Sequence, residues 1–242
     1  MKISIITLFP DMFDGFINTS IIKKGILKEH VNVEIVDMRQ YTKDKHNRVD
    51  DYPFGGGAGL VLMCQPVVDA IKDIKDDNSW VVLMTPQGTP FSQNVAQSYA
   101  STYEHLILVC GHYEGFDERI RDYADAEISI GDYVLTGGEL AAMVISDAII
   151  RLVDGVITKE SHEDDSFSDG LLEYAHYTRP REFEGKEVPE VLLSGHHENI
   201  RKFRLKSSLE KTLKNRPDLL ENRVLSHEEA MLLETIKSET EK

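Results

Sequence analysis

The part of the chain before Gly155 alternates between short apolar runs and segments of helical length, and this alternation constrains the fold more than any other feature. The apolar runs occupy residues 3–9, 31–38, 80–84, 105–110 and 126–131. They are rich in β-branched residues and almost uninterrupted, which is typical of strands buried on both faces of a parallel sheet. The segments between them are long enough for helices, and Ser92 stands where an N-cap is expected. The pattern therefore predicts an α/β fold with a parallel sheet, closed by a long apolar helix near 139–152.

The character of the sequence changes after Gly155. Residues 160–175 contain six acidic residues and no Lys or Arg, with serines and a glycine between them, which predicts a flexible connector. From about Pro180 the pattern is only helical, and Ser226 and Glu229 are spaced as a capping box. The predicted parts are an α/β domain, an acidic flexible linker and a small all-helical domain, over residues 1–155, 156–178 and 179–242.

The charge is unevenly distributed. A net charge of −15 argues against a polyanionic partner unless basic residues gather locally. They do so between Arg201 and Arg216, where seven Lys or Arg residues accompany one acidic residue, and a second basic run covers 39–48. A solvated helix face explains either run alone. Two such runs on an acidic protein favour contact with a nucleic-acid backbone.

Cysteine usage and hydropathy point to a cytoplasmic protein without a membrane partner. Cys64 and Cys110 lie in apolar surroundings without CxxC spacing, which disfavours a disulfide framework and a zinc site. Pro10 and Asp11 interrupt the apolar start before it reaches signal-peptide length. No later run approaches the roughly 18 apolar residues that a membrane span requires.

Three glycine-rich loops, at 53–62, 110–120 and 130–140, are candidate ligand sites. None has the Lys and the Ser or Thr that follow the last glycine of a phosphate loop, and none has the dinucleotide fingerprint. The second and third loops begin where expected strands end, which is where ligands bind in open parallel sheets. Tight structural turns are the alternative for each loop.

The composition of the second and third loops favours a particular ligand. Glycines bring the backbone close to a ligand, and apolar neighbours such as Tyr133 and Leu135 suit a flat, neutral ring such as adenine. The acidic Glu114 and Asp132 suit a positive charge rather than a phosphate. An adenosyl sulfonium combines these properties.

Several motifs give the chain a resemblance to a known family. They are FPDMF (9–13), FGGGAGLVL (54–62), TPQG (85–88), GHYEGFDERI (111–120), SIGDYVLTGGELAA (129–142), DSFSDGLLE (165–173), HYTRP (176–180) and VLLSGHHENIRKFR (191–204). In this order and spacing the chain resembles the bacterial tRNA (guanine-N1)-methyltransferase family over essentially its whole length. The resemblance implies a SPOUT-type α/β fold with a trefoil-knotted cofactor site, a homodimer, and methylation of the guanosine at tRNA position 37, 3′ of the anticodon, by S-adenosyl-L-methionine.

The resemblance also implies residue roles. The cofactor-binding residues are expected to be Thr85, Pro86, Gly111, Tyr113, Glu114, Gly115, Ile130, Gly131, Asp132, Tyr133, Val134, Leu135, Gly137 and Gly138. The tRNA-binding residues, for the anticodon arm, are expected to be His176, Arg179, Ser194, Gly195, Arg201, Lys202, Arg204 and Lys206. Glu118 and Arg119 are interpreted instead as helix pairs or intersubunit contacts.

Methyl transfer to guanine N1 requires a base, because that nitrogen carries a proton at neutral pH, and a positive group near O6, where negative charge develops. The resemblance assigns these roles to Asp165 and Arg151. Asp164 and Asp169 are neighbouring carboxylates that compete for the assignment, and a solubilising linker is the alternative for the acidic run. Mg²⁺ is a candidate helper ion, but no spacing assigns metal ligands.

Three alternatives stay open at this point. The chain could be a related methyltransferase that acts on rRNA or on another tRNA site. It could be a non-catalytic RNA-binding protein that uses the same fold. It could be an enzyme acting on small nucleotides, in which case the basic run at 201–216 would have no role.

Overall fold

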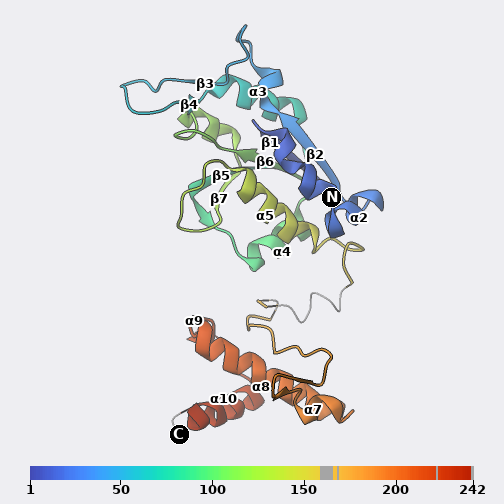
Figure 1. Ribbon diagram of the computed structural model, residues 1–242. Helices are drawn as coiled ribbons and strands as arrows, with labels where there is room; N and C mark the ends of the chain where they lie inside the picture. Colours follow the sequence, from blue (N-terminus) through green and yellow to red (C-terminus); the bar gives the residue numbers. More distant parts are fainter. Residues whose placement is uncertain (159–165, 168, 222, 241–242) are drawn as a thin grey trace. The chain divides into compact units, whose positions relative to one another are not determined.

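The computed structural model describes residues 1–158, 166–167, 169–221 and 223–240. The chain divides into two compact units, Met1–Thr158 and Lys159–Lys242 (Figure 1). Among the described residues, no helix combines the length and the apolar character needed to cross a bilayer.

Unit 1 is built on a five-stranded sheet in which every neighbouring pair of strands is parallel. The order is β2-β1-β6-β5-β7, and the strands are β1 (Lys2–Thr7), β2 (Asn32–Asp37), β5 (Ser79–Pro90), β6 (His105–Cys110) and β7 (Ala126–Ser129). All five overlap the predicted apolar runs, although β5 extends beyond its run to Pro90, so the predicted α/β fold with a parallel sheet is confirmed.

Helices lie on both faces of this sheet. They are α1 (Asp14–Ile17), α2 (Ser20–Leu27), α3 (Cys64–Ile74), α4 (Gln93–Thr102) and α5 (Glu139–Ile150), with 3-10 turns η1 (Pro10–Phe13), η2 (Met38–Tyr41) and η3 (Glu118–Tyr123). Successive strand residues enter different cores: Ile5 packs with α4 and α5, and Ile6 packs with α3. This two-sided burial explains why the strands are continuously apolar. The Ser92 hydroxyl accepts a hydrogen bond from the Val95 N–H at 3.4 Å, as the predicted N-cap should.

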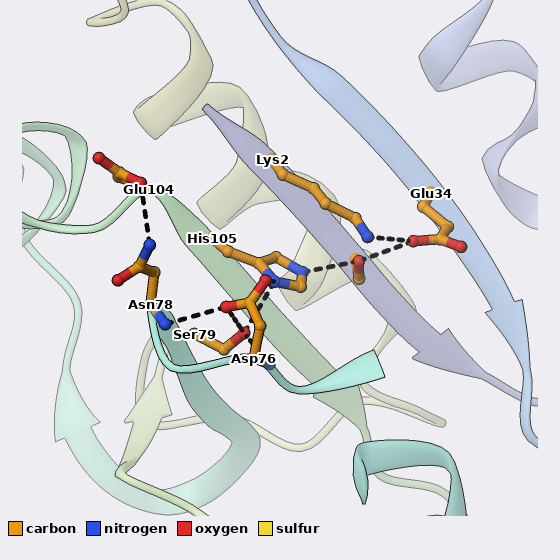
Figure 2. A network of polar contacts seen from close by, with 8 residues as sticks. Lys2, Glu34, Asp76, Asn78, Ser79, Glu104 and His105 are labelled. Atoms are coloured by element: carbon orange, nitrogen blue, oxygen red, sulfur yellow. Dashed lines mark hydrogen bonds and ion pairs between the residues drawn. The ribbon is translucent and has the colours of Figure 1, made fainter. Parts of the chain in front are cut away.

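At the amino ends of the strands, a buried histidine connects three parts of the sheet (Figure 2). The Nε2 of His105 lies 2.9 Å from the Ser4 hydroxyl, and its Nδ1 lies 2.8 Å from the Ser79 hydroxyl and 3.3 Å from Asp76. Glu34 accepts from Ser4 at 3.1 Å. Desolvation lowers the pKa of His105 below its usual value, although Asp76 opposes this effect.

Strand β5 is irregular at its carboxyl end. Met84 and Thr89 both pair with Ile128, so the four residues between them leave the ladder. A Cβ on Gly88 would lie 2.4 Å from the backbone nitrogen of Ile128, so only glycine fits where the strand returns. The TPQG motif at 85–88 forms this bulge. A short hairpin of β3 (Asp50–Asp51) and β4 (Val61–Leu62) carries the first glycine loop.

Unit 2 consists mainly of helices α7 (Glu190–Leu193), α8 (His197–Asn215), α9 (Asp218–Glu221) and α10 (His227–Thr240). Its core contains Leu171, Leu209, Leu233 and Ile236. The predicted capping box is present: the Glu229 N–H donates to the Ser226 hydroxyl at 3.2 Å, and the Ser226 N–H donates to the Glu229 carboxylate at 2.7 Å.

Two details of unit 2 correct the sequence analysis. The expected all-helical domain also contains a hairpin of β8 (Glu182–Phe183) and β9 (Lys186–Glu187). Glu184 and Gly185 have φ angles of 51° and 77°, as a two-residue hairpin turn requires. Strands of two residues are too short to produce a recognisable periodicity.

The second correction concerns the expected flexible linker at 156–178. Leu171 is 2% exposed in the core of unit 2. The Leu172 N–H donates to the Thr212 hydroxyl at 2.9 Å, and the Ala175 N–H donates to the Ser207 hydroxyl at 3.0 Å. The end of the acidic segment is therefore packed on α8, because its apolar residues complete the core of a small helical unit.

Candidate functional site

A cavity of about 400 Å³ opens at the carboxyl ends of β5, β6 and β7. Three segments line it: the bulge of β5, the loop after β6 and the loop after β7. This is the edge at which open parallel sheets bind their ligands.

The cavity brings together nearly all of the expected cofactor-binding residues. Those that line it are Thr85, Pro86, Gly111, Tyr113, Glu114, Gly115, Ile130, Gly131, Tyr133, Val134, Leu135, Gly137 and Gly138. Asp132 does not line it and is exposed to solvent. Sequence reasoning missed ten further lining residues: Met84, Gln87, His112, Phe116, Glu118, Arg121, Ile128, Ser129, Thr136 and Ala141. Most of these lie within the same loops, and that adjacency is the signal that could have identified them.

The loops after β6 and β7 are joined where they meet the cavity. The Gly138 N–H donates to the Gly111 carbonyl at 2.7 Å, and His112 and Gly137 form an antiparallel bridge. A Cβ on Gly138 would lie 2.8 Å from both the Cys110 Cα and the Gly111 nitrogen. Glycine is required at residue 138 because two main chains pass in contact.

The first glycine loop supports the cavity from outside. The Glu114 N–H donates to the Leu60 carbonyl and the Leu62 N–H donates to the Gly115 carbonyl, both at 3.0 Å. Gly59 has a φ of 78°, and a Cβ there would strike the Glu114 carboxylate at 2.4 Å. The loop at 53–62 therefore holds the loop after β6 without lining the cavity.

Acidic groups outweigh the one arginine at the cavity. Arg121 of η3 forms ion pairs with Glu127 and with Glu118, the latter at 3.0 Å, and donates to the Gln87 side chain at 2.6 Å. The hydrogen bond with Glu127 is the main cause of the raised pKa of Arg121. Because carboxylates already neutralise this guanidinium, the cavity offers a phosphate little attraction. Arg119 does not line the cavity and pairs with Asp117 at 2.7 Å. Glu118 does line the cavity, although the sequence analysis did not include it among the cofactor-binding residues.

Two further polar groups lie beneath the glycine pair. The Nδ1 atom of His112 is buried and makes no hydrogen bond within the described part of the chain. Glu139, at the start of α5, is 2% exposed and accepts a hydrogen bond from the Thr7 hydroxyl at 2.8 Å. A Cβ on Gly137 would lie 2.3 Å from the Glu139 carboxylate and 2.9 Å from the His112 Nε2. Both side chains therefore bear directly on the loop after β7.

The expected catalytic residues are only partly described. Arg151 is half-buried at the end of α5, and its backbone N–H donates to the Asp147 carbonyl at 3.1 Å. Asp165 and Asp164 lie outside the described residues. The Asp169 carboxylate accepts from the Leu171 N–H at 3.0 Å. Within the described ranges, no group of three or more His, Cys, Asp or Glu side chains is arranged to hold a metal ion.

The basic run on α8 is less positive than its composition indicates. Arg201 pairs with Glu198 and Glu228 at 2.9 and 2.7 Å. Lys202 lies 3.7 Å from Glu198, and Lys206 pairs with Glu239 at 2.7 Å. These acids lie outside the counted window, so a local count could not include them. Hydrogen bonds that Arg201 and Lys206 donate to these carboxylates raise the pKa of both basic groups.

The other expected tRNA-binding residues also lie in unit 2. Arg204 contacts the ring of Tyr174, and His176 contacts Glu173 at 2.6 Å. Arg179 is exposed. The Ser194 hydroxyl donates to the Val191 carbonyl at 2.7 Å, and Gly195 has a φ of 71°.

Comparisons with known proteins identify the family of the chain. The family model for tRNA (Guanine-1)-methyltransferase TrmD matches residues 1–222. Relatives named tRNA (guanine-N(1)-)-methyltransferase include one from Bacillus cereus, 56% identical, and one from Mycoplasma mycoides subsp. mycoides SC, 51% identical. Each alignment covers 99% of this chain and 100% of the relative. A protein of the same name from Ureaplasma urealyticum serovar 10 is 57% identical over 90% of this chain and 96% of its own length. The chain therefore belongs to the tRNA (guanine-1)-methyltransferase family.

Proposed function

We propose that this protein transfers the methyl group of S-adenosyl-L-methionine to N1 of the guanosine at tRNA position 37, 3′ of the anticodon. The observation that carries the proposal is the cavity at the ends of β5, β6 and β7, in a chain that belongs to this family along most of its length. The donor supplies an electrophilic methyl group on a cationic sulfur.

The residues of the cavity fit such a donor. Its glycine-rich loops let the backbone come close to the edge of an adenine, and Ile130, Tyr133 and Leu135 can pack on its faces. Glu114 lines the cavity and can balance a positive sulfur. Arg121 is paired with two carboxylates, Glu118 and Glu127, so this group adds negative rather than positive charge. The negative phosphates of a nucleotide would be repelled by these carboxylates.

The substrate nitrogen must lose a proton before it can attack the methyl group. We assign the proton transfer to Asp165, whose carboxylate would accept it, and we assign stabilisation of the charge on O6 to Arg151. The support for these roles is the match of DSF at 165–167 and of the end of α5 to the family's pattern. Mg²⁺ is proposed only as a helper whose ligands are not assigned.

The proposal includes a trefoil-knotted, SPOUT-type cofactor site. Its support is the close crossing of the loops after β6 and β7, where Gly138 bonds to Gly111. It also includes a homodimer that binds the anticodon arm through unit 2, and a cytoplasmic location, which a tRNA substrate would require. The support for RNA binding is the set of exposed Lys and Arg side chains on α8.

Transfer of labelled methyl groups to two tRNA transcripts tests the proposal. One transcript has guanosine at position 37, and the other has adenosine there. We expect label in the first only, at N1 of the guanosine. Equal labelling of both would favour a different RNA site, whereas tight uptake of ATP or NAD with no response to S-adenosylmethionine would favour a small-nucleotide enzyme.

A further inference from the structure

A cluster of planar side chains in mutual contact occurs on unit 2, where the segment 171–177 packs on α8. The ring centroids of Tyr174 and His176 lie 4.5 Å apart. The guanidinium carbon of Arg204 lies 4.7 Å from the centroid of the Tyr174 ring. Three planar groups, two aromatic and one cationic, are thus gathered at one place. We call these three residues the stacking cluster.

The segment is fixed where it carries Tyr174. The Leu172 and Ala175 N–H groups bond to hydroxyls of α8, and Lys211 donates to the Tyr174 carbonyl at 3.0 Å. Because backbone contacts on both sides hold Tyr174, its ring needs little further ordering when a ligand arrives.

Arg204 differs in its contacts from the other basic residues of α8 that are expected to bind tRNA. Arg201, Lys202 and Lys206 each contact a glutamate. Among the contacts recorded for the described residues, Arg204 meets the Tyr174 ring and no carboxylate. Arg204 is exposed, so the face of its guanidinium turned away from Tyr174 and its N–H donors can meet a ligand.

Planar groups of this kind recognise unpaired nucleobases. A base that is out of a helix stacks on aromatic rings or on arginine planes, whereas an RNA duplex presents mainly backbone and 2′-hydroxyls. We propose that the stacking cluster binds an unpaired nucleobase of RNA by stacking, and that Arg204 also contacts a neighbouring phosphate. This inference rests on the proposed tRNA methylation and adds the kind of RNA element that unit 2 recognises.

Equilibrium binding of the full-length protein to a tRNA transcript and to a blunt RNA duplex tests the inference. For Tyr174→Leu we expect Kd for the tRNA to rise by about 5-fold to 100-fold, as for the loss of one stacked base. Tyr174→Phe keeps the ring and should stay within about twofold of the parent. Arg204→Lys keeps the charge but loses the plane, so it should also weaken tRNA binding. Duplex binding should not change in either Tyr174 variant.

Matched controls separate stacking from general effects. Phe183→Leu removes an exposed ring from the same unit, and Lys237→Ala removes an exposed charge from α10; neither should change tRNA affinity. Thermal unfolding shows whether Tyr174→Leu still folds, and Arg204→Lys provides a surface variant if it does not.

Two results would overturn the inference: parental tRNA affinity in folded Tyr174→Leu or in Arg204→Lys, or equal losses for tRNA and duplex. A lower melting temperature with unchanged Kd would reduce Tyr174 to a packing role. If the parent protein methylates tRNA while these variants bind normally, only the stacking site fails. If the parent methylates no tRNA, the proposed function fails.

Discussion

Replacement of Gly138 by alanine should damage the cavity through steric overlap alone. The residue has φ −82° and ψ −6°, a conformation that alanine adopts readily, so backbone strain makes no contribution. In open space this change would stabilise the fold by about 0.4–1 kcal/mol, because alanine restricts the unfolded chain. Here the added Cβ would lie 2.8 Å from two backbone atoms of the neighbouring loop and 3.1 Å from the Met84 Cβ. Neither backbone atom can rotate away.

The magnitude follows from two losses. Overpacking of this kind costs about 1–3 kcal/mol, and separating the loops would weaken the Gly138–Gly111 hydrogen bond, worth about 1 kcal/mol. After the gain from alanine is subtracted, we expect the free energy of unfolding to fall by about 1–3 kcal/mol. Because both glycines line the cavity, Kd for S-adenosylmethionine should rise by about tenfold or more.

Urea unfolding and titration calorimetry measure the two effects. Gly15→Ala is the matched control, since a Cβ at Gly15 meets nothing within 4 Å and its φ is not in the left-handed region. It should be neutral or slightly stabilising and should leave cofactor affinity unchanged. If Gly138→Ala matched this control in both measurements, the contact between the two main chains could not be what requires glycine.

Three further outcomes are expected. Asp165→Ala should abolish methyl transfer while Kd for S-adenosylmethionine stays within about twofold; a full rate in this variant would remove Asp165 from the mechanism. Because the pKa of His105 is lowered in the fold, the unfolded chain binds the proton more tightly, so stability should be complete above the unfolded pKa of about 6.5 and decline as the pH falls below it. In His105→Gln the urea midpoint should change less with pH between about pH 7.5 and 5.5 than in the parent protein. An unchanged dependence of the midpoint on pH would contradict this cause. Ser226→Ala should lower the melting temperature through the loss of about 1 kcal/mol of capping, and a larger loss in Ser238→Ala, outside the cap, would refute that origin.

The strands could be predicted because their physical signal is local. Ile5 and Ile6 face different cores, and both cores exclude water, so the sequence has to be apolar at every position of the strand. The same reasoning placed the ends of β6 and β7 and hence the cavity between them. The bulge of β5 was not predictable, because the shift between Met84 and Thr89 depends on the partner residue Ile128 in another strand.

The charge of α8 could not be predicted from its own residues. Glu228 and Glu239 come from α10, which packs on α8, so the balance at Arg201 and Lys206 exists only after the helices pack. Arg121 is a similar case: Glu118 is its neighbour in sequence, but Glu127 reaches it from β7. Ion pairs between elements therefore changed the meaning of both charged segments.

The glycines of the glycine-rich loops fall into two physical classes, and this division explains why a glycine-rich cavity needs no lysine. Gly55 and Gly56 of the first loop have φ angles of 89° and 79° with nothing near their Cβ positions, so conformation requires glycine there. Gly137 and Gly138 are required by what touches them, namely the Glu139 and His112 side chains and the main chain near Gly111. A phosphate loop exposes its backbone N–H groups to an anion, whereas the N–H of Gly138 is consumed by a carbonyl of the neighbouring loop. Gly137 and Gly138 therefore serve the contact between chain segments, and the lining of the cavity also contains carboxylates and apolar side chains such as Glu114 and Leu135.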